Sequence, residues 1–174
     1  MRIACLLDSG FEDSEFRKPH DAFVNAGHDV VVIGLQRDRT LEGYRGAERV
    51  QTDMSIEDCS PDDFDALFIP GGYSPDHLRI NPKVVAFTRS FFDKDRPVFA
   101  VCHGPQLLMT ARVVDGRSLT AWPTVQDDLR HTKATVRDAE VVVDRNLVTS
   151  RKPDDLEAFS RESLLVLEQV GAAR

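Results

Sequence analysis

The 174-residue chain has no long hydrophobic run, no dense block of Lys and Arg, only three cysteines and a single tryptophan. A membrane-spanning helix needs roughly 18 or more consecutive apolar residues, so we expect no membrane partner. The net charge of −7 argues against binding to the phosphate backbone of nucleic acid, and we expect no specific nucleic-acid partner. The short apolar start lacks the features of a signal peptide, so we expect a cytoplasmic protein.

The three cysteines, Cys5, Cys59 and Cys102, form neither a disulfide framework nor a metal-ligand pattern. An odd count without an export signal indicates separate free thiols. No His, Cys and carboxylate cluster has ligand spacing, so we expect no metal and no organic cofactor. Cys5 lies within an apolar run and should be inert, and the acidic residues around Cys59 disfavour its thiolate.

Short apolar runs alternate with amphipathic segments along the whole chain. We predict strands at residues 3–7, 30–34, 65–69, 97–101, 118–120, 141–143 and 147–150, with one or two more short strands in the loop 36–53. We predict helices over about 12–26, 82–94, 103–113 and 153–170. For the first helix, the predicted inner face consists of Phe16, His20, Phe23 and Val24. Apolar runs of this kind are typical of strands buried on both faces, so the pattern predicts one α/β domain, 1–174, with a doubly wound, mostly parallel sheet.

Ligands of doubly wound folds bind at the carboxyl ends of the strands. Three loops should therefore converge: residues 9–13, 71–79 and 102–105. The third loop, Ala100-Val101-Cys102-His103-Gly104, has the layout of a nucleophile elbow with cysteine in place of serine. The positive end of a helix dipole favours a thiolate there. The alternative is that Cys102 is a small buried residue that ends a strand, and that His103 is only a capping or surface residue.

Residues in the other two loops can support such a thiol. A carboxyl at Glu12, kept protonated by burial, would donate a hydrogen bond to the thiolate, although an acid at a helix start is more often solvated. Backbone N–H groups of Gly71 and Gly72, with that of His103, can form an oxyanion hole, although a tight turn also requires glycine. Tyr73 and Trp122 can wall the pocket, or simply pack.

Four segments together resemble the PfpI family of the class I glutamine-amidotransferase-like superfamily. They are Phe11-Glu12-Asp13, the run from Ile69 to Asp76, the run from Ala100 to Leu108, and the run from Val141 to Leu156. The resemblance implies a flavodoxin-like three-layer sandwich with a nucleophile elbow. It also implies roles for single residues: Cys102 as nucleophile, His103 as partner, Glu12 as the acid on the cysteine, and Gly72 and His103 as the positions whose N–H groups face the substrate oxygen. We expect Gly71, Gly72 and Tyr73 to form the substrate and oxyanion site. In this family Asp76 matches a carboxylate that reaches the histidine of a neighbouring subunit, which implies a homodimer or larger homo-oligomer.

Three functions remain open at this level. The first is a stress-protective hydrolase, a glyoxalase or deglycase, in which Cys102 attacks methylglyoxal, glyoxal or their adducts. The second is an intracellular cysteine peptidase with a Cys102–His103–Asp76 triad divided between subunits. The third is a redox-sensing or chaperone-like protein that is oxidised at Cys102. The partner is accordingly a small dicarbonyl, a glycated substrate or a peptide.

Overall fold

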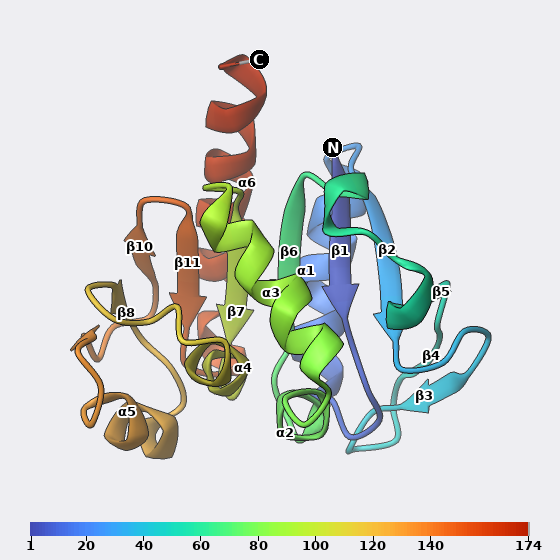
Figure 1. Cartoon of the computed structure of the whole chain (residues 1–174), viewed down its shortest axis with the longest axis horizontal. Coiled ribbons are helices and arrows are strands. Elements are labelled where there is room, and N and C mark those ends of the chain that lie inside the picture. Colours follow the sequence, from blue (N-terminus) through green and yellow to red (C-terminus); the bar gives the residue numbers. More distant parts are fainter. Residues whose placement is uncertain (174) are drawn as a thin grey trace.

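The computed structural model describes residues 1–173, and its centre is a seven-stranded sheet between two layers of helices (Figure 1). The strands lie in the order β10-β11-β7-β6-β1-β2-β5, and every neighbouring pair is parallel except β10 and β11. In chain order the strands are β1 (Arg2–Leu6), β2 (Asp29–Gly34), β5 (Met54–Ser55), β6 (Ala66–Ile69), β7 (Val98–Val101), β10 (Val142–Asp144) and β11 (Leu147–Ser150). The predicted α/β fold with a doubly wound, mostly parallel sheet is therefore confirmed.

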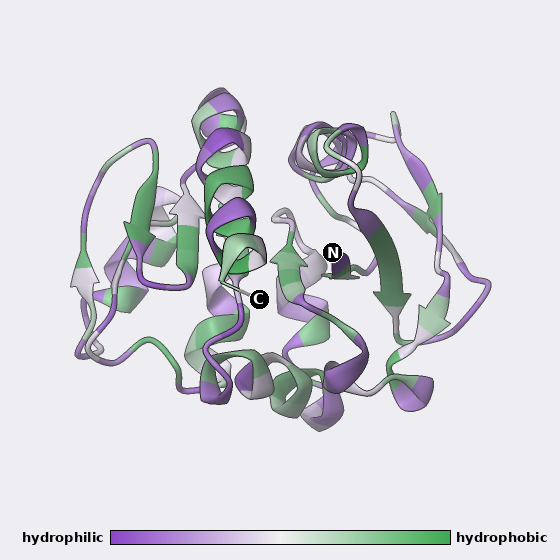
Figure 2. Cartoon of the chain, turned by 90° about the horizontal axis from the view of Figure 1, so that it is seen from above, coloured by the Kyte–Doolittle hydropathy of each residue, from purple (hydrophilic) through white to green (hydrophobic). Residues whose placement is uncertain are grey.

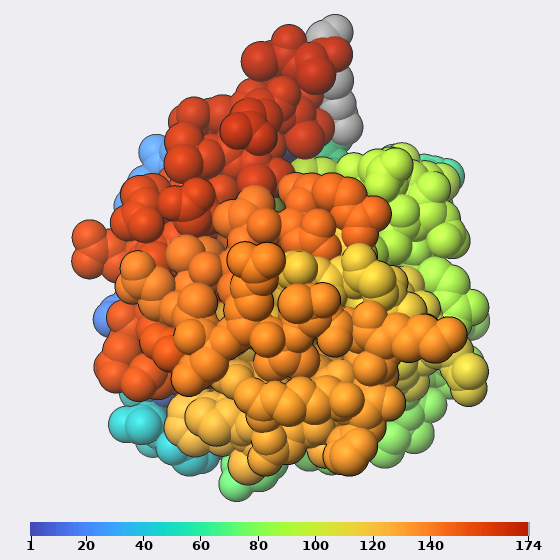
Figure 3. Space-filling view, turned by 90° about the vertical axis from the view of Figure 1, so that its left-hand side faces the viewer, coloured from blue at the N-terminus to red at the C-terminus, as the bar shows by residue number. Residues whose placement is uncertain are grey.

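Two small sheets flank the central one. The antiparallel hairpin of β3 (Thr40–Glu42) and β4 (Arg49–Gln51) lies beyond β2, within the loop 36–53 where short strands were predicted. The parallel pair of β8 (Ser118–Leu119) and β9 (Thr135–Val136) lies at the opposite end, where the orange segment covers one face in Figure 3. Three short 3-10 turns complete the strands and loops: η1 (Ile56–Asp58), η2 (Pro61–Asp63) and η3 (Pro153–Asp155).

Six helices are present among the described residues: α1 (Asp13–Asn25), α2 (Ser74–Leu78), α3 (Pro82–Asp93), α4 (Pro105–Thr110), α5 (Pro123–Leu129) and α6 (Leu156–Ala172). Helices α1 and α6 pack together on one face of the sheet, and α2, α3 and α4 cover the other (Figure 1). In residues 1–173 there is no helix with the length and apolar character that a membrane span requires.

The apolar strands supply a hydrophobic core on each side of the sheet, as the green residues between the helix layers show (Figure 2). In β1, Ile3 and Cys5 belong to the core beneath α1 and α6, whereas Ala4 and Leu6 belong to the core beneath α3 and α4. This division follows from the two-residue period of a strand, which directs neighbouring side chains to opposite faces. Both faces of β1 are buried, which explains its unbroken apolar sequence.

Some helix boundaries and faces differ from the predictions. The helix expected at 103–113 covers only Pro105–Thr110, the short helix α2 lies in the predicted loop 71–79, and α5 lies where no helix was predicted. The predicted inner position of Val24 is wrong, because its side chain is 46% exposed on the outer side of α1. Phe16 and Phe23 are buried as predicted, and His20 is half-buried. A helix whose inner face is fixed by two large rings needs no further apolar residue at its end.

The order of the strands determines where the loops meet. From β1 the sheet extends in one direction through β2 and in the other through β6 and β7, so β1 and β6 mark a topological switch point. The carboxyl ends of β1, β6 and β7 lie side by side there. Backbone hydrogen bonds join the first two loops directly: the Tyr73 N–H donates to the Gly10 carbonyl (2.8 Å) and the Glu12 N–H to the Gly71 carbonyl (3.1 Å). The predicted convergence of three loops is confirmed.

Candidate active site

Cys102 lies at the sharp turn between β7 and α4, with a backbone φ of 61°. Few residues other than glycine adopt this left-handed conformation, and its strain is typical of a nucleophile elbow. Hydrogen bonds hold the turn on both sides: the Cys102 N–H donates to the Ser150 carbonyl (2.9 Å), and the Trp122 N–H donates to the Cys102 carbonyl (2.9 Å). The residue is only 5% exposed, so the thiol meets one small opening.

His103 contacts the thiol despite being its neighbour in the chain. Its Nδ1 is 3.2 Å from the Cys102 Sγ, and its ring stacks on Trp122 with centroids 6.2 Å apart. Burial lowers the pKa of His103, and the carboxylate of Asp76 opposes part of that shift. The imidazole is therefore neutral near pH 7 and can accept a proton from the thiol.

Glu15 is the carboxyl that meets Cys102. It lies in the first turn of α1, is completely buried, and lies close to the Cys102 thiol and to Gly71, which both act on its pKa, while neither of its carboxyl oxygens has a hydrogen-bond partner within residues 1–173. Burial, and next the charge of Glu12, raise the pKa of Glu15 from its ordinary 4.5 to about 8. Glu15 is accordingly protonated at neutral pH and can donate a hydrogen bond to a thiolate.

The contact predicted between Glu12 and Cys102 is therefore corrected to Glu15. Glu12 is the N-cap of α1, and its Oε2 accepts hydrogen bonds from the Glu15 N–H (2.8 Å) and the Ser14 Oγ (2.6 Å). A capping carboxylate turns back onto its own helix, so it cannot also reach the thiol. The residue one turn further, on the face of α1 that meets the sheet, takes that place. Glu12 still lines the cavity in front of Cys102.

Opposing influences act on the Cys102 thiol. Burial, followed by the charge of the nearby Glu15, raises the pKa of Cys102 well above its ordinary value. Backbone N–H groups of Gly72 and His103 point at the sulfur and lower the pKa. Because two negative charges so close together in a buried site repel strongly, the Cys102–Glu15 pair holds one at a time. When Glu15 carries the proton, the thiolate is stabilised by three donors.

Glycine is required at positions 71 and 72, which follow β6 and Pro70. A Cβ on Gly71 would lie 2.3 Å from a carboxyl oxygen of Glu15 and 2.7 Å from the Cβ of Cys102, so the pair can approach only across a glycine. Gly72 has a φ of 77°, and a Cβ there would lie 2.4 Å from the backbone N of Glu12. The backbone N–H groups of Gly72 and His103 lower the pKa of Cys102, whereas that of Gly71 lowers the pKa of Glu15.

The remaining predicted residues, Tyr73 and Asp76, lie at the edge of the site. The Tyr73 N–H is used in the bond to Gly10, so Tyr73 contributes its side chain, which is exposed at the mouth of the cavity. Asp76 lies in α2, and its charge acts on His103 of the same chain. Within residues 1–173 no hydrogen bond joins those two side chains, and the proposed contact of Asp76 with a neighbouring subunit stays a prediction.

These groups open into a cavity of 360 Å³ at the switch point of the sheet. Its walls are Glu12, Glu15, Tyr44, Arg45, Gly72, Tyr73, Cys102, His103, Trp122 and Pro153. Sequence reasoning missed Glu15, Tyr44 and Arg45. The sequence did contain a clue to Glu15, because Glu15 follows the N-cap residue by three positions and directly precedes the buried Phe16. No sequence pattern indicated Tyr44 and Arg45, because they lie in the polar loop between β3 and β4 and reach the site only through the tertiary fold.

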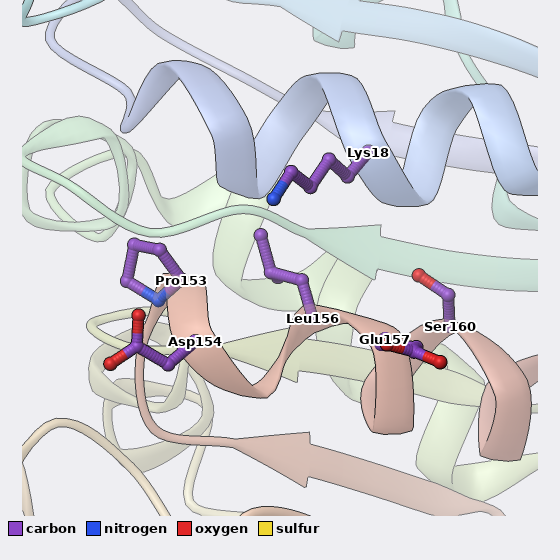
Figure 4. Close-up of a pocket in the computed structure, with 6 residues that line it drawn as sticks. All are labelled: Lys18, Pro153, Asp154, Leu156, Glu157 and Ser160. Carbon is purple, nitrogen blue, oxygen red and sulfur yellow. The ribbon is translucent and has the colours of Figure 1, made fainter.

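A second hollow, of 490 Å³, lies between α1 and α6 (Figure 4). Lys18 on α1 faces Pro153, Asp154, Leu156, Glu157 and Ser160 across it. Pro153 separates this hollow from the cavity of Cys102, but the lining residues include neither a thiol nor an imidazole. In the described part of the chain, no three His, Cys, Asp or Glu side chains are grouped so that they could hold a metal ion. This second hollow therefore lacks the thiol and the imidazole that line the cavity of Cys102.

Curated relatives match nearly the full chain. General stress protein 18 of Bacillus subtilis is 48% identical over 97% of this chain and 98% of its own length. Protein/nucleic acid deglycase 2 of Escherichia coli is 50% identical over 95% of this chain and 97% of its own. A Bacillus subtilis protein named "Putative cysteine protease YraA" is 46% identical over 96% of this chain and 98% of its own.

Solved structures and a family model agree with these relatives. A two-domain protein from Anabaena variabilis, with DJ-1/ThiJ/PfpI-like and ferritin-like domains, superposes with a TM-score of 0.92 and 35% identity. The match covers 98% of this chain and 48% of that protein. The model of the DJ-1/PfpI family matches residues 1–165. With this match and relatives near 50% identity over almost the whole length, the chain belongs to the DJ-1/PfpI family.

Proposed function

We propose that this protein converts methylglyoxal, glyoxal or their early adducts by nucleophilic attack of Cys102. The observation that carries the proposal is that Cys102 and the buried carboxyl of Glu15, whose pKa is raised to about 8, line the same small cavity. Dicarbonyl chemistry needs a nucleophile, a group that moves protons between adjacent carbons, and donors for an alkoxide. Cys102, Glu15 and the N–H groups of Gly72 and His103 supply these three.

In the first step the Cys102 sulfur forms a bond to the aldehyde carbon of methylglyoxal. The carbonyl electron pair moves to the oxygen, which the N–H groups of Gly72 and His103 hold, while the thiol proton passes to the His103 imidazole and the protonated Glu15 gives its proton to that oxygen, which leaves Glu15 as a carboxylate. The product is a hemithioacetal. When the substrate is an adduct on an amine or thiol, the Cys102 sulfur bonds to the former aldehyde carbon as the bond from that carbon to the amine nitrogen or thiol sulfur breaks, and the released group leaves with the thiol proton.

In the second step Glu15 moves the proton from the carbon that bears sulfur to the neighbouring carbonyl carbon. The first carbon is thereby oxidised and the second reduced within one molecule, so the step needs no outside oxidant or reductant. Water then cleaves the resulting thioester, which releases a hydroxy acid and restores the thiol. Methylglyoxal and one water together give lactate, and the cycle is balanced.

The similarity to known proteins supports this choice. Two relatives near 50% identity are named as a deglycase and as a general stress protein, both consistent with a hydrolase that protects against reactive carbonyls. The third relative is named as a cysteine protease, so cleavage of peptides is the second candidate function. The contact of 3.2 Å between Cys102 and His103 favours it, because a thiol and imidazole pair is the core of cysteine peptidases.

The experiment that tests the proposal measures methylglyoxal consumption and cleavage of a fluorogenic peptide panel side by side, with wild type and Cys102→Ala. We expect the wild type to consume methylglyoxal, the variant to lose that activity, and neither to cleave peptides. Peptide cleavage that depends on Cys102, without methylglyoxal turnover, would replace the proposal by the peptidase. Turnover that persists in the folded variant would rule out the nucleophile.

A further inference from the structure

The rim of the cavity includes a segment that the proposed chemistry does not use. Tyr44 and Arg45 lie in the turn between β3 and β4, and both line the cavity in front of Cys102. Neither residue is a nucleophile or an acid. The cavity of 360 Å³ has room for about a dozen water-sized groups, more than methylglyoxal requires. Part of this space can therefore receive the rest of a larger substrate.

The turn that carries Arg45 is held in place by a buried carboxylate. Asp13 accepts hydrogen bonds from the backbone N–H groups of Arg45 (3.0 Å), Ala47 (2.8 Å) and Glu48 (2.8 Å). The Tyr44 N–H donates to the Phe11 carbonyl at 2.8 Å. These bonds fix the turn to the start of α1, which also carries Glu15. The position of Arg45 relative to the reacting groups is thereby set in advance, as recognition sites require.

The side chain of Arg45 is oriented by its neighbours, but these neighbours do not use all of its hydrogen-bond donors. Its Nε lies 3.5 Å from Glu12 Oε1, and its guanidinium carbon lies 5.5 Å from the centre of the Tyr44 ring. Tyr44 in turn packs edge-to-face against Tyr73, with centroids 6.1 Å apart. Within residues 1–173 the two terminal nitrogens of Arg45 donate no hydrogen bond, the ion pair with Glu12 is made through Nε at 3.5 Å, and the side chain is 63% exposed.

We propose that Arg45 is the anion subsite of this cavity and binds a carboxylate carried by the non-reacting part of the substrate. This inference rests on the proposed function and names its substrate class: dicarbonyl adducts of amino acids or thiol acids with a free carboxylate. A guanidinium with two free N–H groups on one edge matches the two oxygens of a carboxylate. One guanidinium beside the negative Glu12 suits a singly charged carboxylate better than a doubly charged phosphate.

The kinetic test compares two hemithioacetals of methylglyoxal, one formed with N-acetylcysteine and the other with N-acetylcysteamine, which lacks the carboxylate. The readout is the ratio of the two kcat/KM values. We expect the wild type to favour the carboxylate-bearing substrate by about tenfold, and Arg45→Gln to reduce the ratio to about one. Arg49→Gln is the matched control, because Arg49 lies in the same hairpin and pairs with Glu42 (3.4 Å) outside the cavity. An unchanged ratio in Arg45→Gln would overturn the subsite.

A binding test separates the subsite from the chemistry. Trp122 is the sole tryptophan and lines the cavity, so its fluorescence reports occupancy. Cys102→Ala protein is titrated with unreactive N-acetyl-S-methylcysteine and with its neutral amide. Tighter binding of the carboxylate, lost with Arg45→Gln, supports the subsite even if the wild type turns over neither hemithioacetal, in which case only the proposed function fails. Equal binding of acid and amide, or stronger competition by inorganic phosphate than by acetate, would overturn the carboxylate assignment.

Discussion

Two cysteines of this protein border hollows, and only one of them lies in a reactive environment. The cavity of Cys102 measures 360 Å³, and the hollow beside Cys59 measures 290 Å³. Burial raises the pKa of both thiols, to about 11 for Cys59, where the nearby Asp58 and Asp63 raise it further. The direction of the pKa shift therefore does not distinguish the two sites.

The difference lies in what each sulfur meets. The Cys59 thiol donates to the Ser55 carbonyl at 3.0 Å, and the carboxylates around it oppose a negative charge. The Cys102 sulfur instead faces two backbone N–H groups, the His103 imidazole and the protonated Glu15. A nucleophilic thiol thus requires donors for the charge and an acceptor for the proton at the same point, and a depressed resting pKa is not the deciding feature.

The largest difference should appear when each of the two cysteines is replaced by alanine in turn. Cys102→Ala should reduce methylglyoxal consumption by about 10³-fold or more, because no other group at the site can form the covalent intermediate. Cys59→Ala should stay within about twofold of wild type. Circular dichroism confirms that both variants fold. Comparable losses in the two would remove the distinction between the sites.

Replacing an acid beside each thiol should change kcat to degrees that differ almost as strongly. Glu15→Gln keeps the size of the side chain but cannot move a proton, so kcat at pH 8 should fall by about 10²-fold. Glu57 lines the Cys59 hollow and pairs with Lys83, and Glu57→Gln should leave kcat unchanged. Full activity in Glu15→Gln would mean that His103 alone handles the proton.

The same Glu15→Gln variant should be more stable than wild type in alkaline solution. The pKa of Glu15 is about 8 in the folded protein and 4.5 ordinarily, so the folded state binds more protons between these values and its stability falls as pH rises through that window. Denaturant titration should show Glu15→Gln more stable by roughly 3–5 kcal/mol at pH 9 and nearly equal to wild type at pH 4. A pH-independent difference would contradict the raised pKa.

A smaller difference, in the stability lost on substitution by alanine, is expected between two glycines with the same backbone conformation. Gly27 and Gly72 have φ values of 83° and 77°, but a Cβ on Gly27 would meet nothing within 4 Å, whereas one on Gly72 would overlap the backbone of Glu12 and Gly10. Gly27→Ala should cost about 1 kcal/mol of stability, from the left-handed backbone alone. Gly72→Ala should cost about 3 kcal/mol and reduce activity as well. Equal losses in thermal unfolding would show that the loop contact adds nothing.

Much of the fold follows from local pattern, since short β-branched and apolar runs such as Val30 to Ile33 are typical of strands in a parallel sheet. The short helices α2 and α5 escaped because each begins at or near a proline in a polar segment and has fewer than two full turns of pattern. The nucleophile could be found because an elbow needs particular residues next to one another.

The rest of the site depends on tertiary geometry. Glu12 and Glu15 are equivalent by composition, and which one meets Cys102 depends on the turn of α1 and on the capping bonds of Glu12. Arg45 reaches the cavity only because Asp13, far from it in sequence, holds its loop. Neither placement follows from spacing alone.

The measurement that tests the central claim most directly is the pH profile of kcat/KM for methylglyoxal in wild type and Glu15→Gln. If Cys102 and Glu15 share one proton, activity in the wild type should rise about tenfold per pH unit and level off near pH 8, where the pair loses its first proton. The variant should show no inflection there. An identical inflection in both proteins would contradict the account, because the titrating group would then not be the Cys102–Glu15 pair.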